Sequence, residues 1–296
     1  MRSITLLSPA KVNLFLHVLD RRPDGYHDVV TLFHRVSLCD QLSLKKLRSD
    51  HVKFRLITNH PKLTVTRENL IYRAYQLLCK TASWKGGIQV SLKKNVPIGA
   101  GLGGGSSNAA FFLMGMNQLF GLGLPKVTLL RLGAQLGSDV PFFLHDLNQA
   151  IGTGRGECVQ PIPFQRQAWF VLVVPSFSIS TRLAYQSFAR RRRSKTRLRL
   201  TRISRADTIT SVLLKHLESG RTSGFFQNDL FRISCSIRPE LGRICALFEG
   251  LGIQPVMSGS GSTIFSMHRS KQEAEDVARQ IRHRKLKAEV FICHTF

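Results

Sequence analysis

Apolar residues alternate with polar ones, or form short runs, through most of the first sixty residues. Four segments have the length and composition of strands: KVNLFLHVL, VVTLFHRVSL, DQLSLKKL and VKFRLI. Residues typical of turns separate them, among them Arg22-Pro23-Asp24-Gly25 and Ser49-Asp50. The pattern predicts a β-rich beginning of the chain.

From Asn69 the apolar spacing becomes helical, and after a short strand, GIQVSLKK, it becomes helical again near Ser106. A further helix is predicted to end at Gly137, because glycine commonly terminates helices. The apolar positions that define these three helices are Leu70, Ala74, Leu77 and Leu78; then Ala109, Phe112, Leu113, Met116 and Phe120; then Val127, Leu130 and Ala134.

The second half of the chain also mixes strands and helices. AWFVLVV (168–174) reads as a strand, the segments 207–218 and 239–249 as helices, and the end as strand, helix and strand finishing in AEVFICHTF. We therefore predict an α/β (α+β) fold with two lobes. The predicted domains are 1–160 and 161–296.

A chain of 296 residues can bury a sizeable core, and no apolar run is long enough to cross a membrane. The N-terminus lacks the apolar core of a signal peptide. Six scattered cysteines without a C-x-x-C pair favour reduced thiols over a zinc site or a disulfide scaffold. These features predict a cytoplasmic protein, either monomer or homodimer.

The net charge of +25 predicts attraction to polyanions, which include nucleic acid, anionic lipid and phosphorylated metabolites. Nine basic residues lie in one segment, 190–205, which contains no aromatic residue to stack on a base. The simpler interpretation, which we favour, is a solvated basic helix face or insert. Charge alone does not choose among these partners.

The segment PIGAGLGGGSSNAA (97–110) places five glycines before a predicted helix. Glycine lets backbone N–H groups converge on an anion, and the start of a helix favours phosphate. The segment contains no lysine, so it is not a Walker A loop, and it lacks the acidic partner of a dinucleotide-binding motif. Hydroxyls of Ser106 and Ser107 can donate to phosphate oxygens or meet the ligand shell of Mg²⁺.

A second glycine cluster, SGSGST (258–263), lies in the other half of the chain. One such cluster is commonplace. Two clusters in separate halves suggest that both lobes present amides to one highly charged ligand, such as a nucleoside triphosphate.

Phosphoryl transfer needs a carboxylate near the acceptor hydroxyl and a cation near the transferred group. Asp139 follows a predicted helix end and can serve as that carboxylate or as a helix N-cap. Lys11 interrupts an apolar strand beside Asn13; it marks a solvent face, or it faces Asp139 across a cleft and lowers the pKa of that carboxyl. Tyr26 and His27 follow a turn and can recognise a nucleobase or simply decorate the surface.

Taken together, these motifs resemble the GHMP kinase superfamily, and more narrowly the 4-diphosphocytidyl-2-C-methyl-D-erythritol kinases of non-mevalonate isoprenoid synthesis. The matching segments are PAKVNLFLHVLDRRPDGYHDVVTLF, PIGAGLGGGSSNAA, LGSDVPFFL, GTGRGE, NDL and MSGSGST, which span nearly the whole chain. The resemblance implies a two-lobed fold with the active site in the cleft between lobes. It also implies ATP, Mg²⁺ and phosphorylation of the substrate's 2-hydroxyl.

The resemblance assigns a role to each candidate residue. Asp139 would be the base or orienting carboxylate, with Lys11 as its cationic partner. The residues expected to bind ATP are Asn69, Lys94, Pro97, Gly99, Gly101, Gly103, Gly104, Gly105, Ser106 and Ser107. Those expected to bind the substrate are Asn13, Tyr26, His27, Tyr185, Gly259, Ser260 and Gly261, with Tyr26 and Tyr185 enclosing the cytosine and His27 bonding its polar edge.

Two other functions remain open. One is a related small-molecule kinase acting on homoserine or mevalonate derivatives, which would have no use for a base-stacking tyrosine. The other is a basic nucleic-acid-binding protein on a related fold, suggested by the charge. The sequence does not identify the Mg²⁺ ligands, the order of substrate binding or the role of the Arg190–Arg205 run, which is not among the family motifs.

Overall fold

The computed structural model describes residues 3–47, 53–61, 63–66, 68–162, 167–193, 202–218, 226–284 and 286–296. The chain divides into two compact units, each built from three segments. Unit 1 comprises Met1–Ala10, Leu38–Ile98 and Gly103–Leu147, and unit 2 comprises Lys11–Ser37, Gly99–Leu102 and Asn148–Phe296. The units alternate along the chain, whereas the predicted domains are contiguous. The assignment of ATP binding and substrate binding to those domains stays a prediction.

Two long strands, β1 (Ser3–Arg21) and β2 (His27–Leu47), contribute residues to both units. The sequence suggested two strands where β2 is continuous. The reason is that β2 has two antiparallel partners in succession: β5 pairs with residues 31–34 and β4 with residues 41–47. The predicted turn between β1 and β2 is present, with Gly25 N donating to Arg22 O at 3.1 Å. The Ser49-Asp50 turn lies outside the described residues.

Within the described chain, seven strands form one sheet in the order β3-β4-β2-β1-β8, with β5 beside β2 and β6 beside β5. Apart from β1 and β2, all of these strands are short. They are β3 (Phe54–Thr58), β4 (Gly87–Lys93), β5 (Gln149–Thr153), β6 (Cys158–Pro161) and β8 (Gln227–Asn228).

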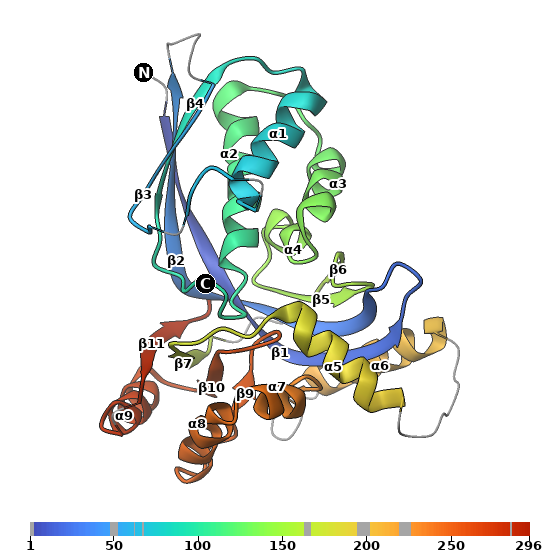
Figure 1. Ribbon diagram of the computed structural model, residues 1–296, viewed down its shortest axis with the longest axis vertical. Coiled ribbons are helices and arrows are strands. Elements are labelled where there is room, and N and C mark those ends of the chain that lie inside the picture. The colour runs from blue at the N-terminus through green and yellow to red at the C-terminus, as the bar shows by residue number, and fades with distance from the viewer. Residues whose placement is uncertain are drawn as a thin grey trace. The chain divides into compact units, whose positions relative to one another are not determined.

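In unit 1, four helices gather on one face of strands β3 and β4 (Figure 1): α1 (Leu70–Ala82), α2 (Gly104–Phe120), α3 (Lys126–Leu136) and α4 (Val140–Leu144). Helix α2 is buried along much of its length, and glycine allows its close approach to the sheet. A Cβ atom at Gly115 would lie 2.6 Å from Leu44 Cδ1 and 2.7 Å from Leu6 Cδ1. The predicted helices of this region are therefore confirmed.

The helix predicted to end at Gly137 is confirmed as α3, but the apolar positions that defined it are not its buried ones. The prediction used Val127, Leu130 and Ala134. Val127 is 70% exposed, and the buried positions are Leu129, Leu132, Gly133 and Leu136. Leucines occur on both faces of this helix, so packing against the neighbouring helices α4, α1 and α2 decides which face is buried.

Unit 2 contains a second sheet, in the order β11-β7-β10-β9, whose pairs are all antiparallel. Its strands are β7 (Trp169–Pro175), β9 (Val256–Met257), β10 (Ile264–His268) and β11 (Ala288–His294), and the helices of the unit are α5 (Thr181–Arg193), α6 (Arg202–Glu218), α7 (Phe231–Ile237), α8 (Glu240–Glu249) and α9 (Lys271–Arg282). The predicted strand, helix and strand at the end of the chain are confirmed.

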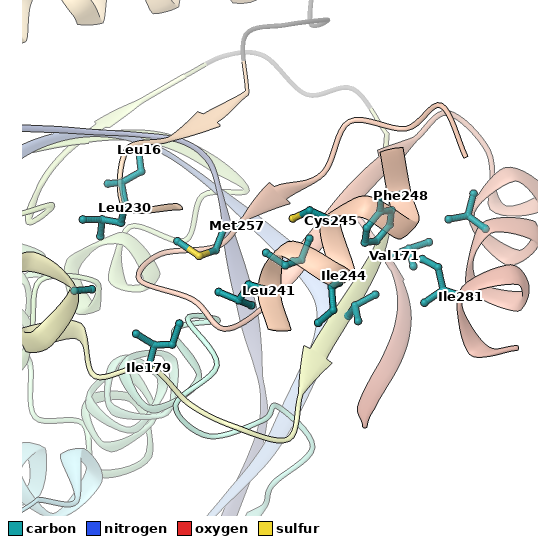
Figure 2. Close-up of a cluster of buried hydrophobic side chains, with 14 of the residues drawn as sticks. Leu16, Val171, Ile179, Leu230, Leu241, Ile244, Cys245, Phe248, Met257 and Ile281 are labelled. Carbon is teal, nitrogen blue, oxygen red and sulfur yellow. The ribbon is translucent and has the colours of Figure 1, made fainter. Parts of the chain in front are cut away.

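The core of unit 2 lies between this sheet and its helices. Leu241, Ile244, Cys245 and Phe248 repeat at helical spacing along α8 and are buried. Figure 2 shows these side chains in one cluster with Val171 of β7 and Ile281 of α9. Both units thus mix strands with helices, which confirms the predicted fold class. Among the helices that the structure describes, none combines the length and the apolar character needed to cross a bilayer.

Candidate active site

The glycine-rich segment adopts a conformation that requires glycine. Gly99, Gly101 and Gly103 have φ angles of 70°, 79° and 68°, in the left-handed region where other residues are strained. The intervening Ala100 and Leu102 have buried side chains. The segment alternates the two residue types because each glycine turns the backbone and each apolar residue holds it against the core.

Helix α2 begins at Gly104, two residues before its predicted start. Its N-cap is Gly103, and within the described chain no side chain caps this helix and no acidic residue lies in its first turn. Ser107 N makes the first helical bond, to Gly103 O at 2.9 Å. The earlier N–H groups of the helix have no intrahelical acceptor, and the helix dipole adds positive potential. The start of α2 therefore fits a phosphate group.

The two serines of the segment differ in their surroundings. Ser107 is fully buried, and its hydroxyl oxygen accepts a hydrogen bond from Ser8 Oγ at 2.8 Å. Ser106 keeps part of its surface exposed. The sequence treated them alike, whereas the structure uses the Ser107 hydroxyl inside unit 1. Ser106 is therefore the better candidate for contact with a ligand.

A buried carboxylate holds the segment from both sides within unit 1. Asp40 is fully buried and ion-paired with Lys94 Nζ. It also accepts from the backbone N–H groups of Asn95 and Val96, at 2.7 and 2.8 Å, and from Asn108 Nδ2 at 2.9 Å. Asp40 thus connects the end of β4, just before the glycines, to the first turns of α2.

The ion pair changes the interpretation of Lys94, which the family resemblance places near adenosine. Its side chain is only 5% exposed. Burial lowers the pKa of Lys94, and the Asp40 carboxylate opposes that shift. Lys94 therefore has a structural partner at this position, and its contact with a nucleotide stays a prediction.

Sequence reasoning missed Asp40, although a signal was present. In β2, Asp40 has the same parity as Leu42 and Leu44, both fully buried, while Gln41 and Lys45 point to solvent. Side chains alternate along a strand, so a carboxylate on the apolar face must find partners inside.

Asn69 is the N-cap of α1. Its Oδ1 accepts from Ile71 N at 3.0 Å, and its Nδ2 donates to Thr64 O at 3.0 Å. This capping explains where α1 begins. The proximity of Asn69 to the adenosine part of ATP stays a prediction.

Asp139 occupies the N-cap position of α4, but in the described chain its carboxylate makes no capping hydrogen bond. It is partly exposed. The capping role that the sequence left open is therefore not the one its carboxylate performs. Asp139 belongs to unit 1 and Lys11 to unit 2, so the predicted pairing between them stays a prediction.

Lys11 is buried, at 3% exposure, which excludes the solvent-facing alternative. Its Nζ donates to Asn13 Oδ1 at 2.6 Å and lies 5.5 Å from the centre of the Phe33 ring. Asn13 Nδ2 in turn donates to Thr31 Oγ1 at 2.7 Å. These bonds fix the amide of Asn13, so its oxygen faces the Lys11 ammonium.

The second glycine cluster packs against the first within unit 2. Ser258 Oγ donates to Gly101 O at 2.9 Å, and Thr263 Oγ1 donates to Ala100 O at 2.7 Å. A Cβ atom at Gly101 would lie 2.3 Å from Ser258 O, so only glycine fits there. Gly99–Leu102 share unit 2 with this cluster, whereas the start of α2 belongs to unit 1, so the presentation of amides by both lobes to one ligand stays a prediction.

The three predicted ligand contacts of the second cluster are Gly259, Ser260 and Gly261. Gly259 and Gly261 have φ angles of 57° and 88°. The Ser260 hydroxyl shares a hydrogen bond with Thr181 Oγ1 at 2.8 Å. These contacts hold the cluster in place, and its binding of a ligand stays a prediction.

The residues predicted to recognise a base gather in unit 2. The ring of His27 lies 5.5 Å from that of Tyr185 and 6.5 Å from that of Phe188. Tyr185 and Phe188 are three residues apart in α5 and so lie on one face of it. Tyr26 is 56% exposed, with the Arg155 guanidinium 5.1 Å from its ring centre. The structure thus brings His27 and Tyr185 together and adds Phe188 and Arg155, which the sequence analysis missed.

Part of the basic run belongs to α5, which ends at Arg193. Arg190 and Arg191 are exposed there, in agreement with a solvated basic helix face. Residues 194–201 of the run lie outside the described residues. All six cysteines are free thiols, as predicted.

No group of three or more histidine, cysteine, aspartate or glutamate side chains with the spacing of a metal site occurs among the described residues. Magnesium that enters with a nucleotide is held mainly by phosphate oxygens and water, so it needs no such cluster. The uncapped start of α2 and the Ser106 hydroxyl fit a nucleotide with its metal.

Two family models match the chain. The model described as GHMP kinases N terminal domain matches residues 69–146, and the model described as GHMP kinases C terminal matches residues 220–288. The first includes the glycine-rich segment and Asp139, and the second includes the second glycine cluster.

Curated relatives match over almost the whole chain. The chain is 37% identical to 4-diphosphocytidyl-2-C-methyl-D-erythritol kinase of Geobacter metallireducens and 36% identical to that of Syntrophotalea carbinolica. Each match covers 95% of this chain and 95% of the relative. Identity at this level over this length shows a common family.

Solved structures agree with these relatives. A crystal structure of 4-(cytidine 5'-diphospho)-2C-methyl-D-erythritol kinase aligns with a TM-score of 0.77 and 32% identity, over 98% of both chains. L. major mevalonate kinase aligns with a TM-score of 0.76 over 99% of this chain and 97% of its own, but at 14% identity it shows only the shared fold. The chain therefore belongs to the 4-diphosphocytidyl-2-C-methyl-D-erythritol kinase family of GHMP kinases.

Proposed function

We propose that this protein transfers the γ-phosphoryl group of ATP to the 2-hydroxyl of 4-diphosphocytidyl-2-C-methyl-D-erythritol, a step of non-mevalonate isoprenoid synthesis. The relatives at 34–37% identity carry the name of this activity. The proposal extends that activity to this chain, using residues whose local surroundings suit each role.

Phosphate binding is assigned to the glycine-rich segment. The left-handed glycines and the uncapped start of α2 supply N–H groups, and the hydroxyl of Ser106 adds a donor. Mg²⁺, when bound with ATP, neutralises charge on the phosphate oxygens.

Catalysis of the phosphoryl transfer is assigned to Asp139 and Lys11. The Asp139 carboxylate orients the acceptor hydroxyl and receives its proton, a role that the family resemblance assigns and that its partial exposure permits. The buried Lys11 ammonium stabilises negative charge on the transferred group, and Asn13, which holds that ammonium, also contributes to substrate binding.

Recognition of cytosine is assigned to Tyr26, His27 and Tyr185. The contact between the His27 and Tyr185 rings is the observation that carries the substrate assignment. It places a flat face beside a polar edge, the combination that a pyrimidine base requires. Homoserine and mevalonate have no base to use it.

The decisive experiment is a kinase assay on the purified chain with ATP, Mg²⁺ and the cytidine-linked alcohol. We expect ADP formation that depends on the alcohol, stops on chelation of Mg²⁺ and resumes when Mg²⁺ is restored. Homoserine and mevalonate are expected to give no turnover. Turnover with either of them, or indifference to cytidine 5′-diphosphate as a competitive inhibitor, would contradict the substrate assignment.

Asp139→Asn tests the catalytic assignment. Loss of a general base is expected to lower kcat by about 10²- to 10⁴-fold with unchanged thermal unfolding. The matched control is Asp207→Asn. This substitution removes the same charge, and Asp207 is exposed on α6. Wild-type kcat in Asp139→Asn would show that the role is wrongly assigned.

The basic charge motivates one further measurement. A salt titration of RNA binding distinguishes a nucleic-acid-binding protein, for which we would expect tight binding with a steep salt dependence and no stabilisation by ATP and Mg²⁺. For this substrate we infer a soluble enzyme that is located in the cytoplasm.

A further inference from the structure

Tyr26 is an aromatic residue with a largely exposed surface. It follows the turn between β1 and β2, and the residue is 56% exposed. Two bonds hold its backbone: Tyr26 N donates to Asp24 Oδ1 at 3.1 Å, and Tyr26 O accepts from Arg22 N at 2.7 Å. The backbone is therefore fixed, and the orientation of the ring depends on what touches it.

The contact on the ring is Arg155. Its guanidinium carbon lies 5.1 Å from the centre of the Tyr26 ring, within the range of a cation–π interaction. Arg155 is not one of the residues that the family resemblance assigned a role. It lies in the turn between β5 and β6, inside the motif GTGRGE.

The turn that carries Arg155 is rigidly built. Gly154 and Gly156 have φ angles of 68° and 111°, and Gly154 O accepts from Val29 N of β2 at 2.7 Å. Glu157 then binds the arginine twice: Oε2 accepts from Arg155 N at 2.6 Å, and Oε1 accepts from Arg155 Nε at 3.3 Å. Glu157 thus holds the Arg155 side chain in the position in which its guanidinium lies over the Tyr26 ring.

We propose that Arg155 is a positioning residue that sets the orientation of Tyr26, so that the ring is ready to receive the cytosine base. The inference rests on the proposed function, because the base is that of the proposed substrate. A ring fixed in advance loses less conformational freedom on binding, and affinity rises accordingly. Glu157 acts one step further back, by holding Arg155.

The test measures dissociation constants for cytidine and for cytidine 5′-diphosphate by calorimetry. Arg155→Met keeps an unbranched apolar stem and removes the guanidinium with its charge. A cation–π contact at a partly exposed site is worth about 0.5–1 kcal/mol, so we expect about two- to fivefold weaker binding of both ligands. The KM for ATP should not change, and kcat at saturating substrate should stay within about twofold.

A double-mutant cycle shows whether Arg155 acts through Tyr26. In a Tyr26→Leu background, Arg155→Met is expected to have no further effect on either ligand. Arg155→Lys, which keeps the charge but loses the planar fork toward Glu157, should restore part of the affinity. Arg279→Met on α9 is the matched control and should bind like wild type, since Arg279 is exposed there.

Two results would overturn the inference. If Arg155→Met weakens cytidine 5′-diphosphate more than cytidine and still does so without Tyr26, Arg155 binds the diphosphate directly. If wild type binds cytidine and Arg155→Met binds it equally well, the arginine does not position the ring. Absence of cytidine binding in wild type would instead reject the proposed substrate, and the inference with it.

Discussion

Two regions hold the glycine-rich segment, and they do so with different chemistry. In unit 1, a buried charge pair anchors its two ends, because Asp40 binds Lys94 and the backbone before the glycines and Asn108 after them. In unit 2, hydroxyls anchor its middle, through Ser258 and Thr263 to the carbonyls of residues 100 and 101. One anchor relies on electrostatics and the other on neutral hydrogen bonds and close fit.

The difference teaches how each anchor should fail. Removing one partner of a buried ion pair leaves an uncompensated charge, which is costly. Removing one neutral hydroxyl costs about 1 kcal/mol, but the same region tolerates no added atom because its backbones touch. Removing a charged group should therefore destabilise the charged anchor most, and adding an atom should destabilise the neutral anchor most.

The largest expected effect comes from breaking the charged anchor. Asp40→Asn keeps the shape of the side chain but leaves Lys94 charged and buried, so the free energy of unfolding should fall by about 3–5 kcal/mol. Urea denaturation measures this change. The double variant Asp40→Asn with Lys94→Met should recover much of the loss, since no charge then remains buried. A loss below about 1 kcal/mol in the single variant would show that the pair does not anchor the segment.

Adding an atom to the neutral anchor should cause the second-largest loss of stability. Gly101→Ala adds a Cβ atom 2.3 Å from Ser258 O at a φ of 79°, and we expect a loss of about 2–4 kcal/mol. Gly105→Ala is the matched control, because its Cβ would meet only Leu70 Cδ1, at 3.7 Å. Its stability should stay within about 1 kcal/mol of wild type. Equal losses at both positions would refute the close-fit explanation.

Lowering the pH should cause a smaller loss of stability, through His34 in unit 2. Burial lowers the pKa of His34 to about 3, while the unfolded chain binds the same proton near pH 6.5. Between these values the unfolded state holds more protons, so stability falls as the pH falls below about 6.5. The loss at pH 5 should be about 2 kcal/mol relative to pH 7. His34→Gln should flatten this part of the pH profile; an unchanged slope would assign the acid sensitivity to other groups.

The smallest expected effect is that of a single hydroxyl. Ser258→Ala and Thr263→Val should each lower the free energy of unfolding by about 1 kcal/mol, since each leaves a carbonyl with one bond fewer. Ser236→Ala, in α7, should be nearly neutral because its hydroxyl is exposed. If either core variant costs as much as Asp40→Asn, the contrast between the two anchors is not real.

Local sequence rules predicted most elements of the fold. Asn69 marked the start of α1 because its side chain caps the helix, and Gly137 marked the end of α3. The rules did less well where a choice depended on a neighbour. The continuity of β2 depends on two partner strands, and the buried face of α3 depends on α4, so neither follows from the spacing of apolar residues alone.

The candidate site followed a similar division. Glycines, Tyr26 and His27 could be proposed from the sequence because their chemistry is visible in a short motif. Asp40, Phe188 and Arg155 were missed because each acquires its importance from a contact distant in sequence. Asp40 reaches Asn108 across 68 positions, for example. Such contacts appear only when the chain is folded.

The sequence by itself determined the residue types, the periodicity and the glycines, because these depend on local backbone geometry and on which side chains avoid water. Those features were sufficient to indicate the fold class and the family. Tertiary structure alone decided that Lys94 is paired, that Ser107 is buried and that Arg155 covers Tyr26. Each of these outcomes depends on where distant segments meet, and a one-dimensional pattern does not encode the distance between two of its own parts.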